Sequence, residues 1–557
     1  MHAPRLTVIS LAALATTLAL TSCSSSGTTT TTDAIKLTAT TPTARGTLDH
    51  VTWNLPMGEP STLDPAKVGD YSPSTVASNV CDPLIRLKAD YSTAPGLATS
   101  WNRPDPKTLV LNLRRGVRFW DGSLMTATDV VASLERQRVP ATQSVNAPVL
   151  ANVTTIKATS GHQVTVRFRT PDSLFLKYLV NGFGAVNKAS YLKKAGPAYG
   201  TARGGLMCTG PFKLNSWRSG DSITLVRNPA YWDASLRPKV KKLTFRFITD
   251  NGTLTSALMS GQIDGSYELA STSAKALRGS KEGSVHYGPS AQTVFLGATS
   301  PTSPLADRRI ADALSLVLDR DALIKNVFDG AAQRQKTFIP SLVWKNSPAK
   351  DVYAKGYAAL PASPEPNAAK AKTLVAEAAP KRRTLTVAMA AGDQQSLQTL
   401  TFLQASAKRI GLKIVIRQLQ PTQMSGLFSN PALRKGLDAT MTLGYVDIPD
   451  PLAYADMLTD PKSPMNWVNY RNSEVTSHVR AAKGTDDPKT SAREFTKAQA
   501  LYAQDYPIVP IACPYERMFL NKRISGTPAS FAYINMPWAA YIGGTGESAG
   551  SGSESSS

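Results

Sequence analysis

Apolar and polar positions alternate every second residue in several parts of the chain, and this period predicts strands. Leu109, Leu111 and Leu113 alternate with Thr108, Val110 and Asn112, so one face of the segment is apolar. Residues 242–248 repeat the pattern. After a break at Arg115 and Gly116, residues 117–120 (VRFW) resume it and end in the turn pair Asp121-Gly122. We therefore expect half-buried strands in these segments.

Other segments follow the helical period. Thr126 stands three residues before Asp129, an approximate capping box that predicts a helix start. Asp307 can cap a helix, and a second helix is expected over residues 321–330. The apolar stripe of the helix after Asp307 consists of Ile310, Ala313, Leu314, Val317 and Leu318.

Strand-like residues 385–389 and 414–416 flank a helical pattern over residues 395–410. This βαβ order implies a partly parallel sheet, so the fold class is α/β with mixed sheets. At about 150 residues per domain, 557 residues correspond to roughly three or four domains. Hydrophobic residues make up 42% and charged residues 18%, which excludes a fully disordered chain.

The first 22 residues have the layout of a secretory signal, with one arginine before an apolar run. The run ends in Leu20-Thr21-Ser22-Cys23, which resembles the bacterial lipobox and implies lipidation of Cys23. A Ser/Thr-rich segment follows and is expected to be a flexible tether. An ordinary signal peptide with a chance cysteine is the alternative. No later segment is apolar for long enough to predict a transmembrane helix.

The formal net charge is +22, which raises the question of nucleic-acid binding. The basic residues come singly or in twos and threes, as in residues 381–383 (KRR), without a long basic block. We therefore expect no nucleic-acid partner and interpret the charge as a basic surface that works beside an anionic envelope.

The cysteines and histidines support little chemistry. Cys81, Cys208 and Cys513 are far apart, and an odd number allows at most one internal disulfide, with at least one cysteine simply buried. The five histidines form no metal-binding spacing, so no metal or cofactor is expected. Ser548 in a GxSxG match and Ser190 in an SxxK match lack the rest of a catalytic set. An extracellular hydrolase is therefore a remote alternative.

An ordered series of motifs resembles the extracytoplasmic solute-binding proteins of ABC transporters, in the oligopeptide, dipeptide and nickel class. The motifs are residues 59–65 (EPSTLDP), 95–101 (PGLATSW), 113–122 (LRRGVRFWDG), 126–130 (TATDV), 209–212 (TGPF), 227–232 (RNPAYW), 260–264 (SGQID) and 318–320 (LDR). The resemblance covers about residues 48–540.

This family implies a type II periplasmic-binding-protein fold, with two lobes built from three parts and joined by a hinge. The expected boundaries are a lipoprotein signal peptide at residues 1–22, the lipidated cysteine and flexible linker at 23–47, domain I at 48–86, 208–296 and 515–542, domain II at 87–207, domain III as the second lobe at 297–514, and a disordered tail at 543–557. Motif residues 227–232 are expected to hold the architecture together.

The resemblance also implies a ligand site. Residues 444–451 (GYVDIPDP) resemble a loop in which peptide-binding members place the carboxylate that pairs with the α-amino group of the ligand. Asp447 takes that place, with Gly444 and Tyr445 beside it. A turn-capping aspartate is the alternative, and we favour that role for Asp450.

Asp70 and Tyr71 correspond to a strip that meets the ligand backbone in peptide binders, although an exposed loop tyrosine is common. We therefore expect a monomeric, lipid-anchored receptor outside the cell that passes short peptides to an ABC permease and its ATPase subunits. A metal chelate, a modified signal molecule or an oligosaccharide is the alternative ligand.

Overall fold

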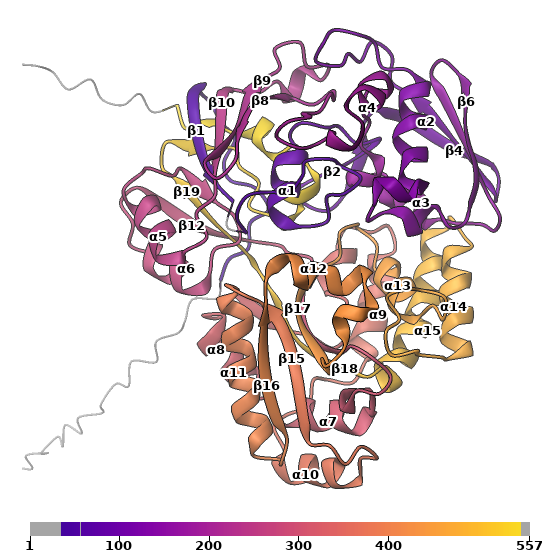
Figure 1. The fold of residues 1–557 in the computed structure, drawn as a ribbon, viewed down its shortest axis with the longest axis vertical. Helices are drawn as coiled ribbons and strands as arrows, with labels where there is room; N and C mark the ends of the chain where they lie inside the picture. Colours follow the sequence, from indigo (N-terminus) through magenta and orange to yellow (C-terminus); the bar gives the residue numbers. More distant parts are fainter. Residues whose placement is uncertain (1–34, 56, 547–557) are drawn as a thin grey trace, which may run out of the picture. The chain divides into compact units, whose positions relative to one another are not determined.

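The computed structural model describes residues 35–55 and 57–546, so Cys23 and Ser548 lie outside the described residues. The fold is mixed α/β and has two lobes, each built around its own large sheet (Figure 1). We define the first lobe as residues 36–291 and 515–546, and the second lobe as residues 292–514. This agrees with the predicted fold class.

The first lobe contains a seven-stranded sheet in the order β12 (Gly283–Gly288), β19 (Glu516–Asn521), β11 (Gly265–Ser266), β1 (Leu48–Asn54), β10 (Val240–Arg246), β9 (Ser222–Arg227) and β8 (Phe212–Arg218). A separate four-stranded antiparallel sheet has the order β4 (Ala98–Asp105), β5 (Thr108–Leu113), β7 (Gln163–Phe168) and β6 (Val153–Ser160). Two small antiparallel pairs are β2 (Ile85–Leu87) with β3 (Thr93–Pro95), and β20 (Ile524–Ser525) with β21 (Gly543–Gly544).

The second lobe contains a six-stranded mixed sheet in the order β14 (Ala332–Arg334), β18 (Ile508–Pro514), β13 (Gln292–Ala298), β17 (Ala439–Tyr445), β15 (Thr384–Ala390) and β16 (Lys413–Leu419). Its helices are α7 (Arg308–Val317), α8 (Arg320–Val327), α9 (Lys350–Ala359), α10 (Ala368–Glu377), α11 (Gln394–Lys408), α12 (Pro421–Ser429), α13 (Leu452–Thr459), α14 (Ser473–Lys483) and α15 (Pro488–Asp505). Those of the first lobe are α1 (Tyr71–Ala77), α2 (Ala127–Glu135), α3 (Leu174–Tyr178), α4 (Ala189–Ala195), α5 (Asn251–Met259) and α6 (Ser271–Leu277).

Two short connections join the lobes. Residues 289–291 lead from β12 to β13, and Tyr515 alone separates β18 from β19. The second lobe is therefore one continuous insert whose two ends cross side by side, which is the arrangement of a two-stranded hinge.

Most local predictions are confirmed. Thr126 and Asp129 form the capping box of α2, and Asp307 caps α7 by accepting the backbone N–H of Arg309. The apolar stripe of α7 is buried in the core of the second lobe. Strands β15 and β16 pair in parallel around α11, as the βαβ pattern predicts.

Two segments are less regular than predicted. Residues 117–120 do not form a strand: Arg118 makes only an isolated bridge to Leu124, because the chain turns at Gly122, whose φ is 86°. The helix expected over residues 321–330 ends earlier, as α8, and Gly330 follows it with a φ of 77°.

Both predicted flexible ends are partly ordered, which corrects the boundaries at 47 and 543. The backbone N–H of Thr38 donates to the carbonyl of Tyr287 at 2.8 Å, and that of Thr41 donates to Thr527 at 3.0 Å. Gly46 pairs with Gly544 of β21. Residues 38–46 therefore contact the first lobe and Gly544 of the tail. Residues 23–34 of the predicted linker and 547–557 of the predicted tail lie outside the described residues.

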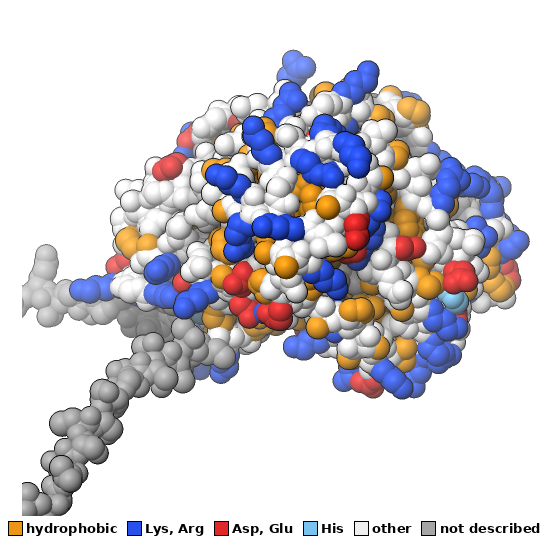
Figure 2. All heavy atoms as spheres, turned by 90° about the horizontal axis from the view of Figure 1, so that it is seen from below, with side chains coloured by type: hydrophobic (Ala, Val, Ile, Leu, Met, Phe, Trp, Pro, Cys, Tyr) orange, Lys and Arg blue, Asp and Glu red, His pale blue; other side chains and the backbone are white. Residues whose placement is uncertain are grey.

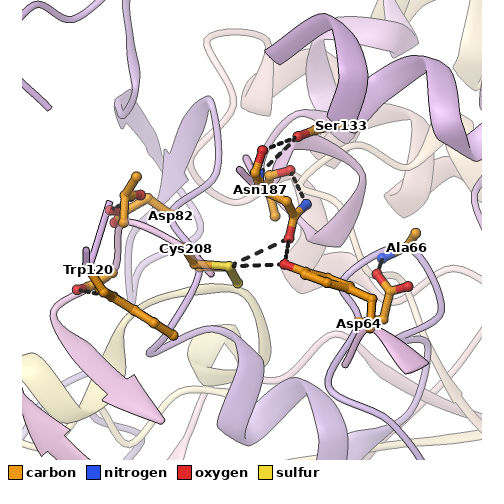
Figure 3. The surroundings of a disulfide bond; sticks show 12 residues. Asp64, Ala66, Asp82, Trp120, Ser133, Asn187 and Cys208 are labelled. Atoms are coloured by element: carbon orange, nitrogen blue, oxygen red, sulfur yellow. Dashed lines mark hydrogen bonds between the residues drawn. A yellow bond between two sulfur atoms is a disulfide. The ribbon is translucent and has the colours of Figure 1, made fainter. Parts of the chain in front are cut away.

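A disulfide between Cys81 and Cys208 closes a sequence separation of 127 residues within the first lobe, and Cys513 is free and buried. Figure 3 places Cys208 between Asp82 and Asn187.

Asp82 accepts hydrogen bonds from the hydroxyl of Tyr231 at 2.6 Å and from Nε1 of Trp232 at 3.0 Å. These motif residues thus have the architectural role that was expected.

The surface carries its positive charge in a dispersed form. Figure 2 shows Lys and Arg side chains spread over the face seen from below, with Asp and Glu side chains between them. Within the described ranges, no helix is long and apolar enough to cross a membrane.

Breaking the disulfide should destabilise the protein. Opening a 127-residue loop restores entropy to the unfolded chain worth roughly 5 kcal/mol in the loop-closure model. We expect the Cys81→Ala/Cys208→Ala variant to unfold at a clearly lower temperature in scanning calorimetry. Reductant should lower the unfolding temperature of the wild type but not of this variant; an unchanged wild type would contradict a structural role. Cys513→Ala is the matched control.

Candidate functional site

The segment between β17 and α13 carries the predicted ligand residues to the boundary between the lobes. Val446 and Ile448 are buried, so the side chain of Asp447 between them lies on the other side of the segment and is half-buried. The backbone N–H of Val446 donates to the carbonyl of Ala291 at 3.0 Å. This bond ties the segment to one of the two hinge connections.

Asp447 is held from two other parts of the chain. Nδ2 of Asn181, in the first lobe, donates to Oδ2 of Asp447 at 2.8 Å. Nδ2 of Asn535, at the end of the short helix Phe531–Asn535, donates to the backbone carbonyl of Asp447 at 2.7 Å. The carboxylate therefore faces the first lobe across the interlobe boundary.

The environment of Asp447 disfavours its charge. Burial raises the pKa of the Asp447 carboxyl to about 6, and the hydrogen bond from Asn181 acts in the opposite direction. Burial, followed by the charge of Asp447, also raises the pKa of the hydroxyls of Tyr178 and Tyr454. A cation placed beside this carboxylate would restore the favourable interaction that burial removes.

Aromatic rings from both lobes meet beside Asp447. The ring of Tyr445 lies 5.1 Å from that of Tyr71 and 5.1 Å from that of Phe531, measured between centroids. Tyr71 and Phe531 belong to the first lobe and are themselves 5.8 Å apart in an edge-to-face arrangement. The structure thus brings the two predicted tyrosines together.

Tyr71 differs from the alternative of an exposed loop tyrosine, because it is the buried first residue of α1. Asp70 caps α1 by accepting the backbone N–H of Tyr71 at 2.7 Å. The side chain of Asp70 keeps solvent-accessible surface, yet surrounding protein raises its pKa by desolvation.

The other two residues of the predicted loop have backbone roles. Gly444 lies inside β17 opposite Thr293 of β13, so its backbone is part of the sheet of the second lobe. Asp450 accepts the backbone N–H of Leu452 at 3.0 Å, which agrees with the turn-capping role that we favoured for it.

A buried polar cluster lies at the hinge connections. Nε2 of Gln292 donates to Glu268 at 2.6 Å, and the backbone N–H of Glu268 donates to Oε1 of Glu516 at 3.0 Å. Burial, followed by the neighbouring Glu268, raises the pKa of Glu516 well above its usual range. Since Gln292 and Glu516 begin β13 and β19, the cluster joins the two connections to the first lobe.

Two cavities lie near the interlobe boundary. One of about 30 Å³ lies beside α1 and is lined by both Asn181 and Asn535; it is too small for a peptide. Another of about 360 Å³ lies where Arg103 meets the end of α14, and charged residues, prolines and small polar residues line it. Asp447 lines neither cavity, so the candidate site at Asp447 rests on its contacts with Asn181 and Asn535 of the first lobe.

Sequence reasoning did not identify Asn181, Asn535 or Phe531. Asn181 is 266 residues and Asn535 is 88 residues from Asp447, so no local pattern links them. Among the described residues, no group of three or more His, Cys, Asp or Glu could hold a metal ion. Ser190 is an exposed residue of α4.

Comparison with known proteins defines the family. The chain belongs to the bacterial extracellular solute-binding proteins, family 5: the sequence model of the family's middle region matches residues 92–466. Such proteins act outside the cytoplasm. The glutathione-binding protein GsiB of Salmonella choleraesuis (strain SC-B67) is 25% identical over 461 residues, which cover 81% of this chain and 86% of GsiB.

Solved structures share the fold. DppA from Helicobacter pylori, in complex with the peptide STSA, has a TM-score of 0.76 at 22% identity and covers 90% of this chain and 99% of its own. NikA from Staphylococcus aureus, in complex with Ni(L-His)2, has a TM-score of 0.72 at 18% identity and covers 87% of this chain and 98% of its own. GsiB and DppA are both named as binding proteins.

The raised pKa of Asp447 predicts a stability cost in the ligand-free protein. The folded state holds the proton more tightly than the unfolded chain, so ionisation destabilises the fold as pH rises from about 4 to 6, and the loss persists above that range. Asp447→Asn should therefore raise the free energy of unfolding at pH 7.5 by on the order of 1–3 kcal/mol and leave it unchanged at pH 4.

Denaturant titrations at both pH values would measure this difference. Glu474→Gln, at an exposed acid of α14 in the same lobe, controls for the loss of one negative charge. Equal effects of the two substitutions at pH 7.5 would contradict the assignment.

Proposed function

We propose that this protein is a lipid-anchored receptor that binds short peptides between its lobes and delivers them to an ABC import permease. The observation that carries the proposal is Asp447, a carboxylate at the interlobe boundary whose pKa is raised to about 6. The α-ammonium group of a peptide supplies the cation that this carboxylate lacks. Closure of the lobes would then exclude water from the pair and strengthen it.

The relatives support a peptide-like ligand. Glutathione, which names the GsiB relatives, is a tripeptide with a free α-amino group, and DppA was solved with a tetrapeptide. In this chain, Tyr445 stands two residues before Asp447 and its ring packs edge-to-face against that of Tyr71, so the loop presents aromatic surface that suits a short peptide. Proteins of this family work with ABC permeases, and the ATPase subunits of the transporter supply the energy for import.

The location rests on two independent features. The disulfide Cys81–Cys208 is typical of proteins that fold outside the reducing cytosol. The signal-like first 22 residues end at Cys23 in a sequence that resembles a lipobox. We infer that Cys23 becomes the lipidated N-terminus and that residues 24–35 connect it to the folded part.

Asp447→Asn should abolish the preference for a free amine. Wild-type protein incubated with a mixture of tri- to pentapeptides should retain them in native mass spectrometry, and N-acetylation of the mixture should reduce retention at least tenfold. Removing the partner of a buried charge costs roughly 3–5 kcal/mol, so the variant should lose the free-amine peptides. Asp450→Asn, which keeps its capping role, is the matched control.

Equal retention of acetylated and free peptides by the wild type would refute the amine assignment. A co-purified metal chelate, modified signal molecule or oligosaccharide in place of peptides would identify the alternative ligand class.

Cys23→Ser should move the protein from the membrane fraction to the soluble fraction, because a serine cannot carry the thioether-linked lipid. Immunoblots of fractionated cells would show the shift, and the mass of the N-terminal peptide would show the missing lipid. Cys513→Ala should leave fractionation unchanged. Persistent membrane association of Cys23→Ser would rule out the lipid anchor.

A further inference from the structure

We propose that Asn181 is a positioning residue: it fixes the carboxylate of Asp447 for the ligand cation only when the lobes are closed, and so couples ligand capture to closure. This inference rests on the proposed function and assigns Asn181 a part in it. It follows from the geometry of the bond between the lobes and from the rigidity of the segment that carries Asn181.

The orientation of the Asn181 amide is set within the first lobe. Its Oδ1 accepts the backbone N–H of Phe183 at 2.9 Å and caps the short helix Gly182–Gly184. A primary amide has one oxygen and one NH2 group, so once the oxygen is used as a cap, the NH2 group must face the other way. That direction leads to Oδ2 of Asp447 at 2.8 Å.

The segment around Asn181 belongs firmly to the first lobe. The backbone N–H of Ile85 donates to the carbonyl of Leu179 at 3.1 Å. Gly182 packs so closely that a Cβ there would lie 2.4 Å from the carbonyl oxygen of Pro65. Asn181 itself is 8% exposed. Its amide therefore moves with the first lobe, whereas Asp447 moves with the second.

Opening of the lobes must break this bond, because its two ends lie on different lobes. The charge of Asp447 also acts on the hydroxyls of Tyr178 on α3 and Tyr454 on α13. Asp450 lies in the same loop, where the charge of Lys177 acts on it. Asn181 contributes a neutral hydrogen bond to this group, and the ligand would contribute the positive charge. The carboxylate thus gains both partners only on closure.

A second interlobe contact provides the matched control. Nε of Arg103 on β4 lies 2.9 Å from Oδ2 of Asp486, and the backbone N–H of Ser173 donates to the carbonyl of Lys483 at 2.9 Å. This contact also crosses between the lobes, at the larger cavity away from Asp447. Removing the ion pair between Arg103 and Asp486 should weaken closure without changing the environment of Asp447.

The test first replaces the amide at position 181 by a carboxylate and then exchanges the amide and the carboxylate between positions 181 and 447, both in the full chain. Asn181→Asp keeps the helix cap, because aspartate caps as well as asparagine, but it sets two carboxylates against each other. At pH 7.5 the radius of gyration in small-angle scattering should increase, and it should return to the wild-type value near pH 5, where the pair shares a proton. The double variant Asn181→Asp/Asp447→Asn should be compact at both pH values, since its amide and carboxylate are merely exchanged.

Ligand binding gives the second measurement. Asn181→Ala should weaken binding of the free-amine tri- to pentapeptide mixture about tenfold, and it should move the midpoint of the pH dependence of binding upward, because the loss of a hydrogen bond to the carboxylate favours its protonated form. Arg103→Ala should weaken binding by a similar factor at every pH and leave the midpoint unchanged.

A compact Asn181→Asp variant at pH 7.5, or a double variant that stays expanded, would overturn the proposal. So would an equal shift of the midpoint in Arg103→Ala. The scattering measurements use no ligand, so they remain decisive even if the wild type retains no peptide. A wild-type protein that retains no peptide would refute the proposed ligand class, but it would leave the role of Asn181 intact.

Discussion

The carboxylate of Asp447 is the constraint around which the site is organised. A carboxylate that is partly removed from water needs charge or several hydrogen bonds to remain ionised. Here the chain supplies one side-chain hydrogen bond, from Asn181, and burial still raises the pKa to about 6. The proposed site would therefore be electrostatically incomplete without a ligand, and this is the physical reason why we propose a ligand that carries a cation.

The architecture allows the second lobe, which carries Asp447, to move relative to the first. The second lobe is a continuous insert attached through residues 289–291 and Tyr515, so it can move as a unit. Asp447 is tied to the first of these connections through the hydrogen bond from Val446 to Ala291. The first lobe is stiffened by the disulfide and by the contacts of Asp82. A rigid first lobe is what allows one asparagine to hold a defined direction.

The aromatic contacts also lie partly within the first lobe and partly between the two lobes. Tyr267 and Tyr533 stack with centroids 3.8 Å apart inside the first lobe, and Phe531 extends this cluster to Tyr445 of the second lobe. These contacts bury apolar area without demanding a single geometry, whereas the bond from Asn181 to Asp447 is directional. Packing thus sets where the lobes meet, and the polar contact sets how the carboxylate points when they do.

The local chemistry of the sequence predicts much of this fold. The caps at Thr126 and Asp307 depend on residues within three positions, and they are found where expected. The ordering of residues 36–46 was not predictable in this way, because Gly46 pairs with Gly544, far along the chain. The same limit applies to the site: Tyr445 and Asp447 stand in one recognisable loop, whereas Asn181 becomes a partner only through tertiary structure.

Ligand choice is set at a finer level than the fold. Relatives that share this architecture were solved with a tetrapeptide in one case and with a nickel–histidine complex in another. Two lobes on two connections can close around either, so closure alone selects nothing. Selection must lie in the few side chains that closure brings together. In the site that we propose for this chain, those side chains are an acid that is costly to ionise alone, an amide that reaches it from the opposite lobe, and two tyrosines. A ligand that carries an ammonium group next to an extended, partly apolar body satisfies all of them at once, whereas a ligand without a cation leaves the buried carboxylate to take up a proton instead.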